Sequence, residues 1–449
     1  MKTRSIVSLL ILLLASAGTA EAQNLAGEVA AIRQQLLDMQ REYEARISEL
    51  ELRVERAEAK ASGAEREASE AFEIAEQTAI DQSSGASAAN TFNPALGAVL
   101  TGRYADIDRG WEQVPGFLRG GEIGTGESGF SLGEAEINLK ANVDGNFFGN
   151  LTFALADEDG AVDVEFEEAW LQTSGFPGGW SLTGGRMFSA AGYLNKFHRH
   201  ADDFADRPLP YQAFFGGQYI VDGIRASWIA PTSLLLELGG ELTWGAGFPA
   251  SANGKTSPGA YTLFAKLGGD VGVSHSWQVG ASWIDVDAVE RSSGEEDGGA
   301  DPATFTGDSD LALIDFVWKW APEGNSGVRN FKLQGEYFSR SESGVFDSLL
   351  YDGDQTGWYL QGIWQFVPRW RVGLRHETVD ADNIGSLLGT ELEDPGRSSS
   401  RSSLMLDWSP SEFSRLRVQY TNDRVLSDTD QQFLLQYIMS VGAHGAHEF

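Results

Sequence analysis

The sequence predicts an all-β transmembrane barrel of about sixteen antiparallel strands, preceded by an N-terminal α-helical coiled coil. Three observations predict this fold. The 53 glycines, 13 tryptophans and 25 phenylalanines are typical of strands with many turns and of aromatic girdles. From about residue 95 onward, apolar and polar residues alternate with a period of two. The connections between the alternating segments are alternately short and long.

Residues 1–22 have the composition of a secretory signal peptide. Lys2 and Arg4 precede an apolar run from Ile6 to Ala15, and Ala20-Glu21-Ala22 forms a cleavage site. This run is too short to cross a bilayer, and no other long apolar run follows it. The chain has no cysteine, so an exported protein of this kind must fold without disulfides.

Residues 23–81 are predicted to form a periplasmic coiled-coil helix, and residues 82–94 a linker. Apolar or small residues recur every seven positions, at Leu36, Tyr43, Leu50, Ala57, Ala64 and Ala71. A second row drifts relative to the first, which predicts imperfect supercoiling. A lone charged helix is the alternative.

Residues 95–449 are predicted to form an outer-membrane β-barrel. In one segment Trp358, Leu360, Trp364 and Phe366 alternate with Gln361 and Gln365, and in another Leu416, Val418 and Tyr420 alternate with Arg415, Arg417 and Gln419. Sixteen such segments follow one another along the chain. A barrel of this size encloses a lumen too wide for its own side chains to fill, so solutes are expected to pass.

The lengths of the connections predict the orientation of the barrel. Short turns such as V-D-G-N (143–146) and V-P-R (367–369) alternate with long acidic loops, for example Glu290 to Asp310, Glu342 to Gln355 and Asp380 to Ser400. Short turns on one side and long loops on the other are typical of barrels in the outer membrane of Gram-negative bacteria. With a periplasmic N-terminal helix, the short turns are periplasmic.

The third external connection, residues 192–217, is the candidate pore constriction. It resembles the loop that folds into the barrel of general porins, and its prolines and aromatic residues would stiffen it and pack it against the wall. Three aspartates are expected to attract cations there. The charged and polar candidates in this loop are Lys196, His198, Arg199, His200, Asp202, Asp203 and Asp206.

His198, His200 and Asp202, with Asp203 nearby, are also candidate metal ligands. Imidazole nitrogens and carboxylates bind divalent transition metals such as zinc. The alternative is that these side chains are simply the polar lining of the constriction. No other cofactor is expected.

Every second side chain of a strand should face the lumen, which predicts a wall with both basic and acidic side chains. The acidic loops at the mouth would attract cations, whereas the basic side chains of the wall could stabilise anions. The residues predicted to line the pore are Glu134, Glu136, Lys140, Arg225, Lys266, Lys332, Arg340, Arg371, Arg375, Arg415 and Arg417, with Glu237, Glu241, Glu336 and Glu377. The alternative is that these charges pair with one another and only hydrate the wall.

Three runs resemble the phosphate-selective porin O and P family: E-A-E-I-N-L-K-A-N-V-D-G-N-F-F-G-N-L-T-F-A-L, V-E-F-E-E-A-W-L-Q and L-T-G-G-R-M-F-S. The resemblance implies a trimeric sixteen-stranded barrel with a signal peptide and, in some members, an N-terminal coiled coil. Anion selectivity there rests on arginine ladders and clustered lysines. Here the candidate constriction has only Lys196 beside several aspartates, so the architecture is carried over and the substrate is not.

These observations bear on three classes of function. The first is a channel for passive uptake of small hydrophilic or charged solutes, with a divalent-metal (zinc) uptake channel using His198 and His200 as its variant. The second is a structural barrel whose coiled coil ties the outer membrane to the cell wall. An enzyme is not expected, because the chain has no G-x-S-x-G, H-E-x-x-H or Gly-rich phosphate loop. The expected partners are two further copies in a homotrimer, outer-membrane lipid and the cell wall, and no nucleic acid.

Overall fold

The computed structural model describes residues 34, 94–121, 123–133, 135–158, 161–244, 247–250, 258–292 and 303–442. The predicted signal peptide lies outside the described residues, as do the coiled coil apart from Gln34 and the linker apart from Pro94. Within the described part, no helix is both long and apolar enough to cross a membrane.

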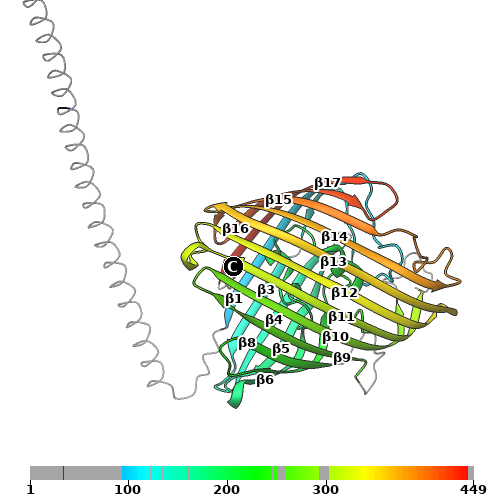
Figure 1. Ribbon diagram of the computed structural model, residues 1–449, viewed down its shortest axis with the longest axis horizontal. Coiled ribbons are helices and arrows are strands. Elements are labelled where there is room, and N and C mark those ends of the chain that lie inside the picture. The colour runs from blue at the N-terminus through cyan, green and yellow to red at the C-terminus, as the bar shows by residue number, and fades with distance from the viewer. Residues whose placement is uncertain are drawn as a thin grey trace, which may run out of the picture. The chain divides into compact units, whose positions relative to one another are not determined.

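Among the described residues from Pro94 to Gly442, seventeen strands and one short α-helix make up the barrel (Figure 1). The strands are β1 (Ala95–Asp106), β2 (Gly129–Leu132), β3 (Ala135–Asn142), β4 (Phe147–Glu158), β5 (Ala161–Thr173), β6 (Trp180–Phe188), β7 (Ile220–Ile229), β8 (Leu235–Trp244), β9 (Ala260–Val271), β10 (His275–Ser292), β11 (Thr304–Trp320), β12 (Asn330–Phe346), β13 (Leu349–Val367), β14 (Trp370–Gly385), β15 (Ser399–Ser411), β16 (Ser414–Arg424) and β17 (Asp430–Gly442). The helix α2 (Leu209–Phe215) lies between β6 and β7, together with the 3-10 turns η2 (Leu194–Lys196) and η3 (Arg199–Ala201); η1 (Pro177–Gly179) and η4 (Pro322–Gly324) lie in short turns.

The sheet closes on itself, because β17 pairs with β1 in antiparallel register from Gly97 opposite Gly442 to Asp106 opposite Phe433. Both β2 and β3 pair with β1, so they form two halves of one barrel strand. The barrel therefore has sixteen antiparallel strands, and the prediction of a sixteen-stranded barrel is confirmed.

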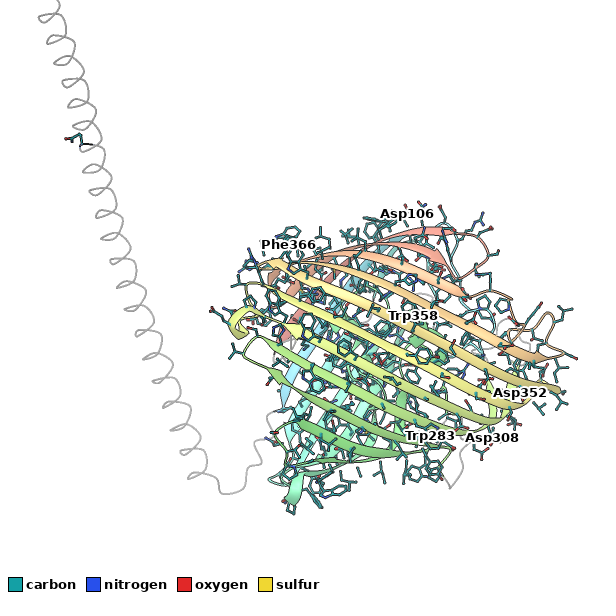
Figure 2. All side chains as sticks on the ribbon, viewed as in Figure 1. Asp106, Trp283, Asp308, Asp352, Trp358 and Phe366 are labelled. Carbon is teal, nitrogen blue, oxygen red and sulfur yellow. The ribbon has the colours of Figure 1, made fainter. Side chains whose placement is uncertain are left out.

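Side chains alternate between the two faces of the barrel wall as the sequence predicted. On β13, Trp358, Leu360 and Trp364 are exposed on the outer surface, whereas Tyr359 and Gln361 are buried on the inner one. Figure 2 shows Trp283 and Trp358 on the outside of the barrel and aspartates such as Asp308 and Asp352 toward the ends of their strands. The outer surface of the barrel is therefore apolar, as in barrels whose outer surface contacts lipid.

The predicted long loop from Glu342 to Gln355 is wrong. β12 continues to Phe346 and β13 begins at Leu349, so the connection is the two-residue turn Asp347-Ser348. Both turn residues have positive φ, 44° and 74°, as a tight hairpin with the twist of its strands requires. The polar residues of this stretch are strand residues, and polarity alone did not distinguish a strand from a loop.

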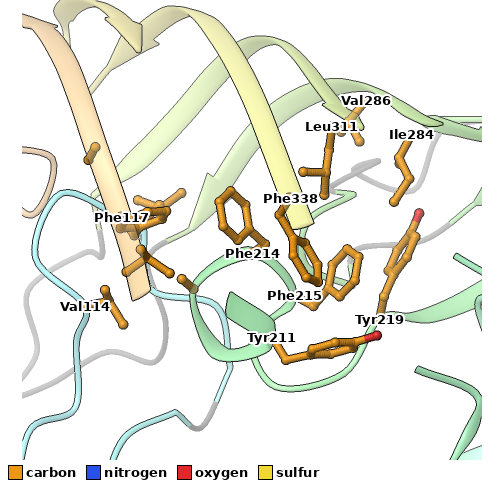
Figure 3. Packing of buried hydrophobic residues seen from close by; sticks show 14 of the residues in the cluster. Val114, Phe117, Tyr211, Phe214, Phe215, Tyr219, Ile284, Val286, Leu311 and Phe338 are labelled. Carbon is orange, nitrogen blue, oxygen red and sulfur yellow. The ribbon is translucent and has the colours of Figure 1, made fainter. Parts of the chain in front are cut away.

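A cluster of buried apolar side chains lies on the inner side of the wall (Figure 3). Tyr211, Phe214 and Phe215 of α2 pack on Phe338 of β12, with ring centroids 5.4 to 5.7 Å apart. Phe117, from residues 107–128 between β1 and β2, meets Phe214 edge-on at 5.3 Å. Two connecting segments therefore share one apolar core with inward-facing strand residues.

Candidate functional site: the β6–β7 segment and the wall that it contacts

Residues 189–219, here called the β6–β7 segment, contain all the residues predicted for the constriction. Glu336 of β12, 3 % exposed, binds this segment with one carboxylate. It accepts hydrogen bonds from the backbone N–H groups of Tyr193 (3.1 Å) and Leu194 (2.9 Å) and from the hydroxyls of Tyr211 (3.0 Å) and Tyr359 (2.7 Å). An ionised carboxylate offers about four acceptor positions, and four donors occupy them here.

Glutamates on other strands bind the same backbone. The N–H of Ala190 donates to Glu241 of β8 at 2.9 Å, and the N–H of Leu209 donates to Glu377 of β14 at 2.7 Å. Gly192 donates to the hydroxyl of Ser282 on β10 at 3.3 Å. Polar side chains of at least four strands therefore satisfy backbone donors that the segment would otherwise leave unpaired.

The three aspartates of the segment lie against basic side chains, Asp202 and Asp203 buried and Asp206 half-buried. Asp203 contacts Lys332 and lies 2.8 Å from Arg371, and Asp206 lies 2.7 Å from Arg375 and also contacts Arg401. Burial by itself would raise the pKa of Asp203, but the charges of Lys332 and Arg371 outweigh it and hold this pKa well below its usual range. Asp203 and Asp206 are therefore neutralised by partners and do not set up the open acidic field that the sequence suggested.

Asp202 differs from the other two aspartates. Its carboxylate lies 3.2 Å from Arg207, and its backbone carbonyl accepts hydrogen bonds from Arg417 (2.6 Å) and Arg415 (3.4 Å). Burial raises its pKa to about 6 in spite of Arg207. Asp202 therefore faces arginines and is not grouped with His198 and His200, with which its residue type and position predicted a shared metal site.

The two histidines instead meet glutamates of β3 and β5. His198 Nδ1 lies 3.2 Å from Glu136 and 3.1 Å from Glu167, and its Nε2 lies 3.1 Å from Glu168. His200 Nδ1 lies 2.7 Å from Glu136. Burial alone would lower the pKa of His198, but the hydrogen bonds to Glu167 and Glu168 outweigh it and raise this pKa well above its ordinary value.

A β-bulge explains how two consecutive glutamates reach one imidazole. Thr152 of β4 pairs with Glu168, and the next residue, Phe153, pairs with Phe166, so Glu167 has no opposite residue. In a regular strand Glu167 and Glu168 would point to opposite faces of the wall, and a bulge re-aims one side chain. The donor atoms of Glu136, Glu167 and His198 lie within 4.8 Å of one another, so these three residues could hold a metal ion.

Most of the basic residues predicted to line the lumen are paired. Arg225 donates to Glu241 at 2.6 Å, Arg340 donates to Gln355 at 2.8 Å, and Arg417 lies 3.0 Å from Asp407. Lys266 is buried and Lys140 is exposed, while Glu134 lies outside the described residues. The exposed charged side chains of the β6–β7 segment are Lys196 and Arg199.

Two groups of residues were missed from the sequence. The first is the segment between β1 and β2, where the carbonyl of Gly116 accepts hydrogen bonds from Gln355 (2.6 Å) and Asn383 (2.8 Å), and Trp111 donates to Asp423 (2.9 Å). The sequence feature that could have identified this segment is the run G-W-E-Q-V-P-G-F-L (residues 110–118), which is too apolar for an exposed loop. The second group is Glu167 and Glu168. Both side chains reach the same imidazole only because of the bulge in β5, which the sequence pattern does not show.

The similarity of this chain to known proteins is limited. No protein-family model matches it. It is 29 % identical over 343 residues to an uncharacterized protein of Aquifex aeolicus, which covers 72 % of this chain and 70 % of that protein. The resemblance to phosphate-selective porins therefore stays a hypothesis.

Solved outer-membrane proteins share the barrel. The outer-membrane channel DcaP of Acinetobacter baumannii matches with a TM-score of 0.50 at 14 % identity, over 78 % of this chain and 97 % of that one. An anion-selective porin of Comamonas acidovorans matches with a TM-score of 0.47 at 11 % identity, over 78 % and 99 %. The chain shares its barrel fold with the outer-membrane channel DcaP.

Proposed function

We propose that this chain forms an outer-membrane channel for passive uptake of small hydrophilic or charged solutes, narrowed by the β6–β7 segment. The observation that carries the proposal is a closed sixteen-stranded wall with apolar side chains outside and charged side chains inside. Strand side chains alone cannot fill a barrel of this width. The hydrogen bonds from the segment to Glu241, Glu336 and Glu377 support its lying across the lumen.

The accessible charges of the narrow region have both signs in this proposal. Lys196 and Arg199 are exposed, Glu167 and Glu168 are partly exposed, and Asp203 and Asp206 lie against basic partners. A field from exposed cations raises the local concentration of anions. The partly exposed carboxylates of Glu167 and Glu168 act in the opposite sense, so we expect only weak charge selectivity near neutral pH.

Purified protein in planar bilayers tests both parts of the proposal. Stepwise conductance supports a channel, and the sign of the reversal potential in asymmetric KCl gives the selectivity. Replacing Lys196 and Arg199 together by Gln should move the reversal potential toward cations. A closed barrel with no conductance steps would favour the structural alternative, in which the predicted coiled coil tethers the membrane to the cell wall.

A second candidate function is uptake of divalent transition metals. It is favoured by His198 and His200, which meet Glu136 on β3. Growth of a zinc-limited strain should then depend on the two histidines. If growth is equal with both histidines replaced, uptake of zinc through this channel is excluded.

We also propose a homotrimer, in line with barrels of this size and with the predicted coiled coil. Mass measurement of the intact protein in native detergent tests it, and a monomer would contradict it.

A further inference from the structure

We propose that Glu136, Glu167 and His198 form a binding site for one divalent transition-metal ion of the zinc class. The site differs from the set predicted from the sequence: β3 and the bulge of β5 supply the carboxylates, and the β6–β7 segment supplies one imidazole. It is a binding property of the folded chain and does not depend on conduction.

The spacing of the donor atoms fits a small ion. Ligand atoms about 2.0–2.1 Å from a tetrahedral zinc ion lie roughly 3.3–3.4 Å from one another. His198 Nδ1 lies 3.2 Å from the nearer oxygen of Glu136 and 3.1 Å from that of Glu167. Two edges of the coordination shell thus already have nearly the required length, and the third pair of donors is within 4.8 Å.

A second observation, independent of spacing, also points to a metal. A metal-binding histidine usually donates its other ring nitrogen to a carboxylate, which fixes the orientation of the ring. Here Nε2 of His198 faces Glu168 at 3.1 Å, and Glu168 is in turn held by Asn150 (2.9 Å) and the indole of Trp170 (2.9 Å). The far side of the imidazole is therefore oriented by the kind of outer partner that metal sites have.

The charge of the site and its accessibility to solvent also favour a bound metal ion. Glu136, Glu167 and Glu168 place three carboxylates around one imidazole. Binding of a metal ion would release the proton from Nδ1 of His198, and the dication would then balance two of these three charges. The side chains of His198 and Glu167 are 19 % and 11 % exposed, so an ion can reach them. Nitrogen and carboxylate donors with three protein ligands suit zinc, with a fourth position left for water.

The test uses the folded full chain in detergent with His444 and His447 replaced by alanine, which removes two histidines outside the described residues. Titration with Co²⁺, followed by its visible absorption, should give one saturable site per chain that Zn²⁺ displaces and Mg²⁺ does not. Glu167→Gln should weaken binding at least ~100-fold, since an amide is a poor zinc ligand, and Glu168→Gln by ~10–100-fold as an orienting partner.

The matched control is Glu165→Gln, the same change at an exposed position on β5, which should bind as the parent does. Circular dichroism checks that each variant is folded, and His198→Gln replaces Glu167→Gln if the latter does not fold. Absence of a saturable site in the parent would overturn the proposal, and so would equal affinities for Glu165→Gln and Glu167→Gln.

Discussion

The substitution Glu336→Gln should release the β6–β7 segment from the wall while keeping the shape of the side chain. The glutamate of β12 accepts hydrogen bonds from two backbone N–H groups of the segment, those of Tyr193 and Leu194, and from the hydroxyls of Tyr211 and Tyr359. A glutamine offers one acceptor oxygen, which can serve two of these four donors, and its NH₂ group must then face another donor.

The loss of docking free energy of the β6–β7 segment follows from the number of hydrogen bonds lost. Each hydrogen bond to a charged group contributes about 1.5–3 kcal/mol. Three of the four donors belong to the segment, so loss of two of these three bonds removes ~3–6 kcal/mol of docking free energy. Since 1.4 kcal/mol is a factor of ten, the equilibrium constant for release should rise by roughly 10²–10⁴-fold. The barrel wall itself should persist, because the ladder between β12 and its neighbours is unchanged.

Hydrogen exchange followed by mass spectrometry measures this release directly. Peptides covering residues 189–197 should exchange much faster in Glu336→Gln, and single-channel recordings should show more current fluctuations. The control is Glu237→Gln: this inward-facing glutamate of β8 makes no hydrogen bond to the segment among the described residues. Equal exchange in the wild-type protein and a folded Glu336→Gln variant would refute the role assigned to this carboxylate.

Three other predictions address the same region. Phe338→Ala should lower the free energy of unfolding, measured by urea titration, by about 3–5 kcal/mol, because it leaves a cavity in the apolar cluster. Phe316→Ala, on the outer face, should lower it by less. Equal losses would show that Phe338 is not packed in a core. The lowered pKa of Asp203 means that its ion pairs stabilise the fold above its unfolded pKa, about pH 4, and that this contribution is lost as the pH falls further. The difference in melting temperature between wild type and Asp203→Asn should therefore shrink below pH ~4, and a constant difference would contradict this. Gly357→Ala should lower the free energy of unfolding by about 1–3 kcal/mol and speed hydrogen exchange in α2, because the new Cβ would lie 2.8 Å from the ring of Phe214. In the control Gly362→Ala the new Cβ has no contact closer than 3.5 Å, so stability and exchange should not change. Equal hydrogen exchange in both variants would show that α2 does not pack against Gly357.

The strands were predictable because lipid outside and polar groups inside impose a period of two on every wall segment. That is why segments such as 357–366 and 415–420 were assigned to the correct faces. The boundaries were less predictable, as the hairpin at Asp347-Ser348 shows. Residues 341–344 of β12 and 352–355 of β13 have no apolar side chain on either face, so they carry no apolar stripe.

The functional residues could be found only in part. His198 and His200 were identified as a possible ligand pair by their type, but their actual partners, Glu136 and Glu167, lie about 62 and 31 positions earlier in the chain. Asp202, Asp203 and Asp206 were assigned an open field because the sequence does not show that arginines of β14, β15 and β16 would reach them.

The sequence by itself determined the wall: the alternation, the number of strands and the short turns are local properties that each segment carries alone. Tertiary structure decided what stands against the inside of that wall. Whether a carboxylate there meets an arginine, an imidazole or a backbone N–H depends on strand register, on one bulged residue in β5 and on the fold of two long connections. These bring together residues far apart in the chain, and pair interactions of that range leave no periodic mark on a single sequence.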